Sequence, residues 1–150
     1  MPISKIRFNL FISACKDITK ESISKLGITD ILNVANDVQT PLFHNCDVKL
    51  HRPYTFSDKP ADAKKHAPGA AKYAKELIDK GSILLIHCQA GKSRSPHVAA
   101  LVLSEIENID YDKAYERILV ARQSVMKYSM GKAILDLDSN WLDRAFGRDK

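Results

Sequence analysis

The 150-residue sequence is about one domain long, and its 45% hydrophobic and 27% charged residues exclude extended disorder. A formal net charge of +5 favours anionic partners without choosing among phosphoproteins, lipid headgroups and nucleic acids. The three cysteines form no CxxC pair and no apolar run reaches membrane-spanning length, so we expect one reduced, cytoplasmic domain over residues 1–150 without a disulfide framework or a membrane span.

The first third of the chain predicts three strands and a short helix. Apolar and polar residues alternate over residues 6–12, which is typical of one strand with one buried face. A helix over residues 20–26 is expected to end at Gly27, because glycine adopts the left-handed conformation common at helix ends. The apolar segment 28–36 and the shorter segment 46–50 predict the second and third strands.

The middle of the chain predicts a loop, a helix and a buried strand. The proline-containing segment 51–62 indicates a loop, and residues 69–81 predict a helix that ends at Gly81. Residues 83–86, with the sequence ILLI, are apolar on both faces, as in a central strand covered by helices. Residues 95–109 are apolar nearly all round and predict a buried helix.

Two amphipathic helices are expected to complete the chain. One covers residues 111–125, and the other carries Ile134, Leu137, Trp141 and Ala145 on one face. This order of strands and crossover helices predicts an α/β fold with a central, mostly parallel sheet flanked by helices. Sites in such folds lie beyond the carboxyl ends of the strands.

A loop that carries a thiol and a guanidinium follows the predicted central strand. A nucleotide-binding P-loop ending at Gly91 and Lys92 would need a glycine at position 86, which is Ile86, so that interpretation fails. The remaining pattern is C-x5-R, from Cys88 to Arg94, between the last parallel strand and a buried helix.

This pattern suits the binding of a phosphate dianion. Loop N–H groups and a helix N-terminus converge on one point, where their positive field favours the thiolate of Cys88. Arg94 presents a planar fork to two phosphoryl oxygens, and Gly91 permits a tight turn. The predicted phosphate-binding residues are Gln89, Ala90, Gly91, Lys92, Ser93 and Arg94.

The string HCQAGKSRS, residues 87–95, resembles the signature loop of the cysteine-dependent protein tyrosine phosphatase superfamily. The flanking segments GITDILNVAND (27–37) and GSILLIHCQAGKSRSPHVAALVL (81–103) are similar to the small dual-specificity branch, and the resemblance covers most of residues 1–125. It implies a phosphatase-like domain in which no metal or other cofactor takes part. The sequence predicts no oligomeric state.

The resemblance also implies roles for the loop residues. Cys88 is expected to attack phosphorus and form a phosphocysteine, while Arg94 and the loop amides stabilise the charge on the equatorial oxygens. Ser95 is expected to donate to the sulfur as it leaves. His87 is expected to order the loop by hydrogen bonding and not to act as a base.

In this branch an aspartate on a loop before the cysteine protonates the leaving group. Asp58, in a proline-flanked loop, fits that position best. Asp62 is better suited to capping the start of the following helix, and Asp47 is expected to lie in a strand.

The chain departs from the branch after its second-last predicted helix. There the branch carries an arginine followed by a Pro-Asn pair that supports the phosphate loop. Here Arg122 is retained, while Tyr128 and Ser129 occupy the positions of the pair, which leaves Ser129 as a candidate for the supporting hydrogen bond. Cys15 and Cys46 are expected to be packing thiols, although either could trap an oxidised Cys88.

The short chain leaves little room for a deep pocket, so we expect phosphotyrosine and phosphoserine or phosphothreonine in a protein as substrates. Lys92, with Lys49, His51 and Arg52 upstream, keeps a phosphoinositide or RNA 5′-phosphate substrate open, although Gln89 stands where lipid phosphatases tend to carry a lysine. A phosphate-binding module without turnover is the remaining alternative.

Overall fold

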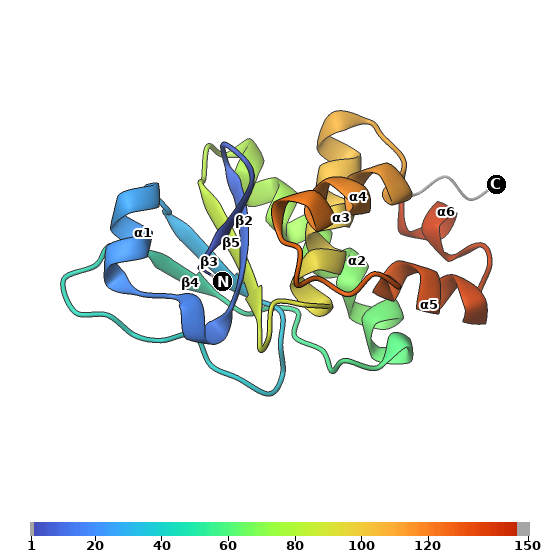
Figure 1. The fold of residues 1–150 in the computed structure, drawn as a ribbon, viewed down its shortest axis with the longest axis horizontal. Coiled ribbons are helices and arrows are strands. Elements are labelled where there is room, and N and C mark those ends of the chain that lie inside the picture. The colour runs from blue at the N-terminus through green and yellow to red at the C-terminus, as the bar shows by residue number, and fades with distance from the viewer. Residues whose placement is uncertain (1, 147–150) are drawn as a thin grey trace.

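The computed structural model describes residues 2–146, so Met1 and residues 147–150 of the predicted domain lie outside the described residues. Its strands form one sheet in which only the first pair is antiparallel, and every other neighbouring pair is parallel (Figure 1). The predicted mostly parallel α/β fold is therefore confirmed. In spatial order the strands are β1 (Ser4–Arg7), β2 (Leu10–Ala14), β5 (Leu84–Cys88), β3 (Asp30–Asn33) and β4 (Lys49–His51).

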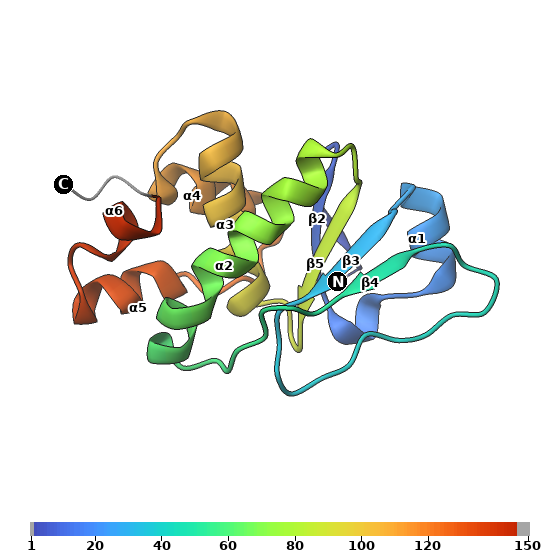
Figure 2. The same ribbon diagram turned by 180° about the vertical axis from the view of Figure 1, so that it is seen from behind.

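Helices cover both faces of this sheet. The helix α1 lies on one face, while α2, α3 and α4 pack on the other, with α5 and α6 outside them (Figure 1; Figure 2). Within residues 2–146, no helix combines the length and the apolar character needed to cross a membrane. The helices are η1 (Cys15–Asp17), α1 (Lys20–Leu26), α2 (Pro60–Asp79), α3 (Arg94–Glu107), α4 (Tyr111–Ala121), α5 (Met130–Leu137) and α6 (Trp141–Ala145).

The central strand β5 is buried throughout and apolar over its first three residues, because its two faces pack into two cores. Leu85 packs into the core under α1, together with Ile31 of β3. Leu84 and Ile86 point the other way into the larger core formed with α2 and α3. Alternate side chains of a strand point to opposite faces, so a strand covered on both sides has no polar face.

The N-terminal alternation belongs to two strands, so the single strand predicted over residues 6–12 is wrong. The chain turns at Phe8 and Asn9, and β1 and β2 pair as an antiparallel hairpin with Arg7 opposite Leu10. Phe8 is 67% exposed as a result, whereas every residue of β2 is buried between β1 and β5. Because the alternation of apolar and polar residues continues across this tight turn, the sequence pattern does not show where the turn lies.

The helix predicted over residues 69–81 begins earlier, at Pro60, inside the segment expected to be a loop. Pro60 occupies the first turn of α2, where its missing N–H costs no hydrogen bond, and the helix continues through Pro68. The predicted start at residue 69 is therefore wrong, since α2 runs through Pro68 and packs on α3.

Three further expectations differ from the structure. The third strand begins at Lys49, so Asp47 lies in an exposed loop. The helix predicted over residues 111–125 ends at Ala121. The last predicted helix is divided in two at residues 138–140, which leaves Leu137 67% exposed because it no longer shares a face with Trp141.

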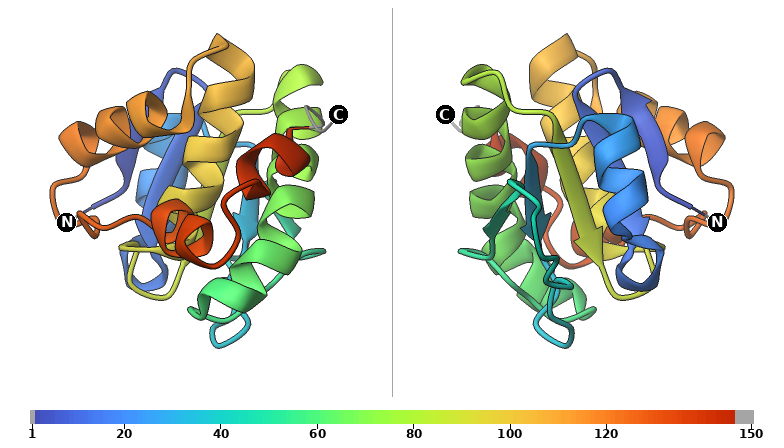
Figure 3. Two further views of the ribbon diagram at one scale, coloured as in Figure 1. Left: turned by 90° about the vertical axis from the view of Figure 1, so that its right-hand side faces the viewer. Right: turned by 90° about the vertical axis from the view of Figure 1, so that its left-hand side faces the viewer.

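The parallel strands place their following loops at one end of the molecule. The carboxyl end of β5 lies beside those of β2 and β3, with Cys88 opposite Ala14 and His87 opposite Asn33. Figure 3 shows the loops after these three strands gathered at the lower edge of both views. The C-x5-R loop is one of them, as expected for a site in this fold class.

Candidate active site

Cys88 and Arg94 mark the two ends of the predicted phosphate loop. Cys88 is the last residue of β5 and is 2% exposed, and Arg94 is the first residue of α3. The sulfur of Cys88 lies 3.2 Å from the hydroxyl oxygen of Ser95, one residue further along the helix. The structure thus brings together three of the four predicted catalytic residues at one helix N-terminus.

Gly91 occupies the middle of the loop in a conformation that requires glycine. Its φ is +68°, and an added Cβ would lie 2.7 Å both from the backbone nitrogen of Ala14 and from Nη2 of Arg122. The loop is therefore pressed against the end of β2, and a side chain at this position would displace it.

Backbone groups and one buried arginine hold the loop in place. The N–H of Cys15 donates to the Gln89 carbonyl at 3.0 Å, and the N–H of Met126 donates to the Lys92 carbonyl at 2.9 Å. The Nε–H of Arg122 donates to the Gly91 carbonyl at 3.0 Å. These bonds fix carbonyls at three loop positions, which leaves the loop N–H groups as the polar groups available to an anion.

Arg122 is 2% exposed and connects the loop to the N-terminal part of the chain. Its Nη1 donates to the Pro2 carbonyl at 2.8 Å and to the Ser4 hydroxyl at 3.2 Å. Its Nη2 lies 3.4 Å from the Asp17 carboxylate. The retained arginine thus supports the loop through the Gly91 carbonyl, a role that the sequence analysis did not assign to it.

Ser129 does not provide the predicted loop support. Its hydroxyl accepts from the N–H of Lys132 at 3.0 Å and caps α5, and its other side-chain hydrogen bond within the described residues is with Tyr111. The proposed replacement of the Pro-Asn pair is therefore wrong, and Met126 supplies a backbone donor instead.

Arg94 is held by two groups outside the loop. Its side chain is 5% exposed, and its Nη1 donates to the Phe56 carbonyl at 3.0 Å. The Asp37 carboxylate faces the end of the guanidinium, with Oδ1 3.1 Å from Nη1 and Oδ2 3.1 Å from Nη2. Sequence reasoning missed Asp37, although an acidic residue shortly after a neighbouring parallel strand was a usable signal.

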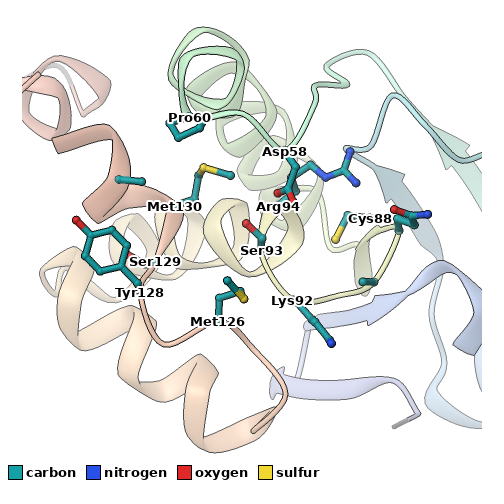
Figure 4. A pocket seen from close by; sticks show the side chains of 13 residues that line it. Asp58, Pro60, Cys88, Lys92, Ser93, Arg94, Met126, Tyr128, Ser129 and Met130 are labelled. Carbon is teal, nitrogen blue, oxygen red and sulfur yellow. The ribbon is translucent and has the colours of Figure 1, made fainter. Parts of the chain in front are cut away.

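The two aspartates near the start of α2 lie in different places. Asp58 lines the same cavity as Cys88 and Arg94 (Figure 4). Asp62 lies in the first turn of α2 but is not its N-cap, which is Lys59.

Asp62 instead accepts from the N–H and the hydroxyl of Ser57, at 3.3 and 2.6 Å. The Ser57 hydroxyl lowers the pKa of Asp62 because it stabilises the carboxylate. Asp62 thus braces the loop that carries Asp58, and the structure favours Asp58 as the group that reaches the cavity.

His87 points away from the phosphate loop, as expected. Its Nε2 lies 2.8 Å from the Thr40 hydroxyl, and its Nδ1 lies 3.1 Å from the Cys88 carbonyl. Burial lowers the pKa of His87, so the ring is neutral at neutral pH. It orders the strand end on which Cys88 stands.

The cavity has a volume of about 340 Å³ and two chemically different sides. Figure 4 shows Cys88, Arg94 and Asp58 on one side, and Met126, Tyr128 and Met130 on the other. The second side is completed by Pro60 and Ala133. In the part of the chain that the structure describes, no three His, Cys, Asp or Glu side chains form a group that could hold a metal ion.

Comparison with known proteins gives one family. Residues 10–135 match the family described as "Dual specificity phosphatase, catalytic domain". The chain is 29% identical over 118 residues to Dual specificity protein phosphatase Mpk3 of Drosophila melanogaster, and 29% identical over 111 residues to human Dual specificity protein phosphatase 9. These matches cover 78% and 73% of the chain, which spans 29% of the length of each of these curated relatives.

Solved structures share the fold. Human DUSP28 superposes with a TM-score of 0.78 at 21% identity, and the match covers 98% of this chain and 96% of that one. A mouse putative dual specificity phosphatase complexed with zinc tungstate gives a TM-score of 0.78 at 24% identity, over 95% of this chain and 89% of that one.

Proposed function

Because the chain belongs to the dual specificity phosphatase catalytic domain family, we propose that residues 1–150 form one catalytic domain that hydrolyses phosphotyrosine and phosphoserine or phosphothreonine in proteins through a phosphocysteine intermediate. The observation that carries this proposal is that Cys88, Arg94 and Asp58 line one cavity, while the Ser95 hydroxyl contacts the Cys88 sulfur. The nucleophile Cys88, the charge-stabilising Arg94 and the acid Asp58 thus border the same cavity.

In the first step the Cys88 thiolate attacks phosphorus opposite the leaving oxygen. The sulfur–phosphorus bond forms as the bond to the serine, threonine or tyrosine oxygen breaks, and Asp58 gives its proton to that oxygen. The loop N–H groups, the α3 N-terminus and Arg94 stabilise the charge on the three remaining oxygens. This assignment leaves no step for a divalent metal.

In the second step water hydrolyses the phosphocysteine. The Asp58 carboxylate takes a proton from the water, whose oxygen bonds to phosphorus while the sulfur departs as thiolate. Ser95, 3.2 Å from that sulfur, donates a hydrogen bond to the departing charge. Inorganic phosphate is released and the enzyme returns to its starting state.

The cavity walls support phosphorylated protein side chains over more highly charged substrates. Met126, Tyr128 and Met130 give one side an apolar character that suits a tyrosine ring or an alkyl chain. Of the described residues that line the cavity, Lys92 is the single lysine, so few cations are available for an inositol lipid or an RNA 5′-phosphate end. The cytoplasmic location expected from the sequence stays a prediction.

The test is turnover of a substrate panel by wild type and by Cys88→Ser. We expect wild type to hydrolyse phosphotyrosine and phosphothreonine peptides faster than a phosphoinositide or an RNA 5′-triphosphate. Cys88→Ser is expected to abolish turnover because a hydroxyl is not ionised at neutral pH. Cys46→Ser, at a partly buried cysteine that does not line the cavity, is the matched control and should keep full activity.

Three results would contradict the proposal. Near wild-type turnover by Cys88→Ser would exclude the phosphocysteine, and faster hydrolysis of the lipid or the RNA than of either peptide would exclude protein substrates. Activity that disappears with a chelator and returns with zinc or magnesium would contradict the assignment of charge stabilisation to the protein.

A further inference from the structure

The guanidinium of Arg94 contacts other protein groups along one part of its edge and leaves another part without a protein partner among the described residues. A guanidinium carries five N–H donors in one plane. Nη1 donates to the Phe56 carbonyl at 3.0 Å, and Nη2 donates to Asp37 Oδ2 at 3.1 Å. Nη1 also lies 3.1 Å from Asp37 Oδ1 in the ion pair. Two of the five donors are therefore hydrogen-bonded to the protein, and a third faces the Asp37 carboxylate.

The two remaining donors lie on one edge of the group. Asp37 occupies the edge between Nη1 and Nη2, so the Nε–H and the second N–H of Nη2 remain side by side. Within residues 2–146 neither has a hydrogen-bond partner, and Arg94 lines the cavity that contains Cys88. Two parallel N–H groups match the spacing of two phosphoryl oxygens.

We propose that Asp37 is a positioning residue, which locks Arg94 so that its Nε–Nη2 edge faces the phosphoryl group. The proposal rests on the proposed function and adds a residue to it. Asp37 stays bound to the other edge while substrate is present, because the two anions use different N–H groups. The carboxylate also offsets the charge of a guanidinium whose side chain is 5% exposed.

The second anchor of Arg94 links it to the loop that carries Asp58. Phe56 donates its N–H to the Val34 carbonyl at 2.9 Å, and the Phe56 carbonyl also accepts from the N–H of Asn36 at 3.3 Å. This bridge joins the segment after β3 to the segment before Asp58. Without Asp37 the guanidinium would keep one anchor, the Phe56 carbonyl, and could pivot about it.

The opposite role for Asp37 would be that of a competitor. A carboxylate that blocks the phosphate site would have to leave before substrate binds, so its removal would strengthen binding. The geometry contradicts this role, since Asp37 takes the end of the guanidinium and leaves the Nε–Nη2 edge open. The two roles predict changes of opposite sign.

The experiment measures phosphotyrosine-peptide affinity by calorimetry in Cys88→Ser protein, with and without Asp37→Asn or Asp37→Ala. A pivoting guanidinium loses bidentate contact, so we expect either Asp37 change to weaken binding about tenfold to a hundredfold. In the active enzyme the same changes should lower kcat/KM by a similar factor. Asp47→Asn, at an exposed loop aspartate that does not line the cavity, is the control and should change neither quantity.

Asp37→Asn keeps the shape of the side chain at a position that is 45% exposed, so its melting temperature should stay near that of the parent protein. Unchanged or tighter peptide binding by both Asp37 variants would overturn the positioning role. The calorimetric affinity measurement needs no turnover. An inactive wild type would therefore refute the proposed function, while the effect of the Asp37 changes on peptide binding could still be interpreted.

Discussion

Replacing Arg122 with methionine should destabilise the whole chain, because this one side chain joins three separate segments. Methionine has a similar length and is apolar, so it removes the donors without opening a large cavity. The change deletes the bonds to the Gly91 and Pro2 carbonyls and to the Ser4 hydroxyl, at 3.0, 2.8 and 3.2 Å. It also leaves the Asp17 carboxylate without its cation.

The magnitude follows from the burial of the two charges. Removing one partner of a buried ion pair costs about 3 to 5 kcal/mol, mainly because the other charge stays buried and unpaired. The side chain of Arg122 is 3% exposed and that of Asp17 is 12% exposed, with 3.4 Å between them. This residual solvent contact and the long distance favour the lower end, about 3 kcal/mol, which corresponds to a melting temperature lower by roughly 6 to 12 °C.

The assay is urea denaturation followed by circular dichroism, with kcat measured on the same samples. Arg117→Met is the matched control, because Arg117 lies in α4 shortly before Arg122, is 44% exposed and pairs with Glu107 at the surface. The Arg117→Met change should lower the free energy of unfolding by less than about 1 kcal/mol. Equal free energies of unfolding for the two variants would refute the argument from burial, and full activity in Arg122→Met would refute the role of Arg122 in shaping the loop.

Three other predictions follow from single contacts. Gly91→Ala should lower both the melting temperature and kcat, because its φ is +68° and a Cβ would meet a backbone nitrogen at 2.7 Å. Gly81→Ala has a φ of +95° and open space, so it should cost only the conformational penalty of about 1 to 2 kcal/mol; an equal loss in both would contradict the role of the close approach. Asp58→Asn should slow turnover by about 10² to 10⁴, and less for aryl phosphates with acidic phenols, whereas Asp62→Asn should show no such dependence on the leaving group. The reverse pattern in a leaving-group series would assign the acid to Asp62. Burial lowers the pKa of His97 to about 3 in the folded chain, from 6.5 when unfolded, so the unfolded chain binds the extra proton and stability falls as pH drops below 6.5. Between pH 6.5 and 4.5 this loss is on the order of 2 kcal/mol, and His97→Gln should flatten that part of the stability curve; an unchanged slope in urea titrations would disprove it.

The sequence alone determined those features that depend on residues close together in the chain. The C-x5-R loop could be located because Cys88, Gly91 and Arg94 lie within one segment. That segment directly follows the apolar run ILLI, which predicts a buried strand. The helix over residues 20–26 and its end at Gly27 were predicted correctly for the same reason, since a left-handed glycine is a local signal. The fold class followed from the order of such segments.

Only the tertiary structure decided what meets that loop. Asp37 and Phe56 reach Arg94 from far along the chain because β3 and β5 pair in parallel and end at one edge of the sheet. Met126 rather than Ser129 supports the loop because the path of the chain after α4 places a backbone N–H against the Lys92 carbonyl. Hydrogen bonds of this kind depend on strand register and helix packing, which set distances between residues that no spacing in the sequence encodes.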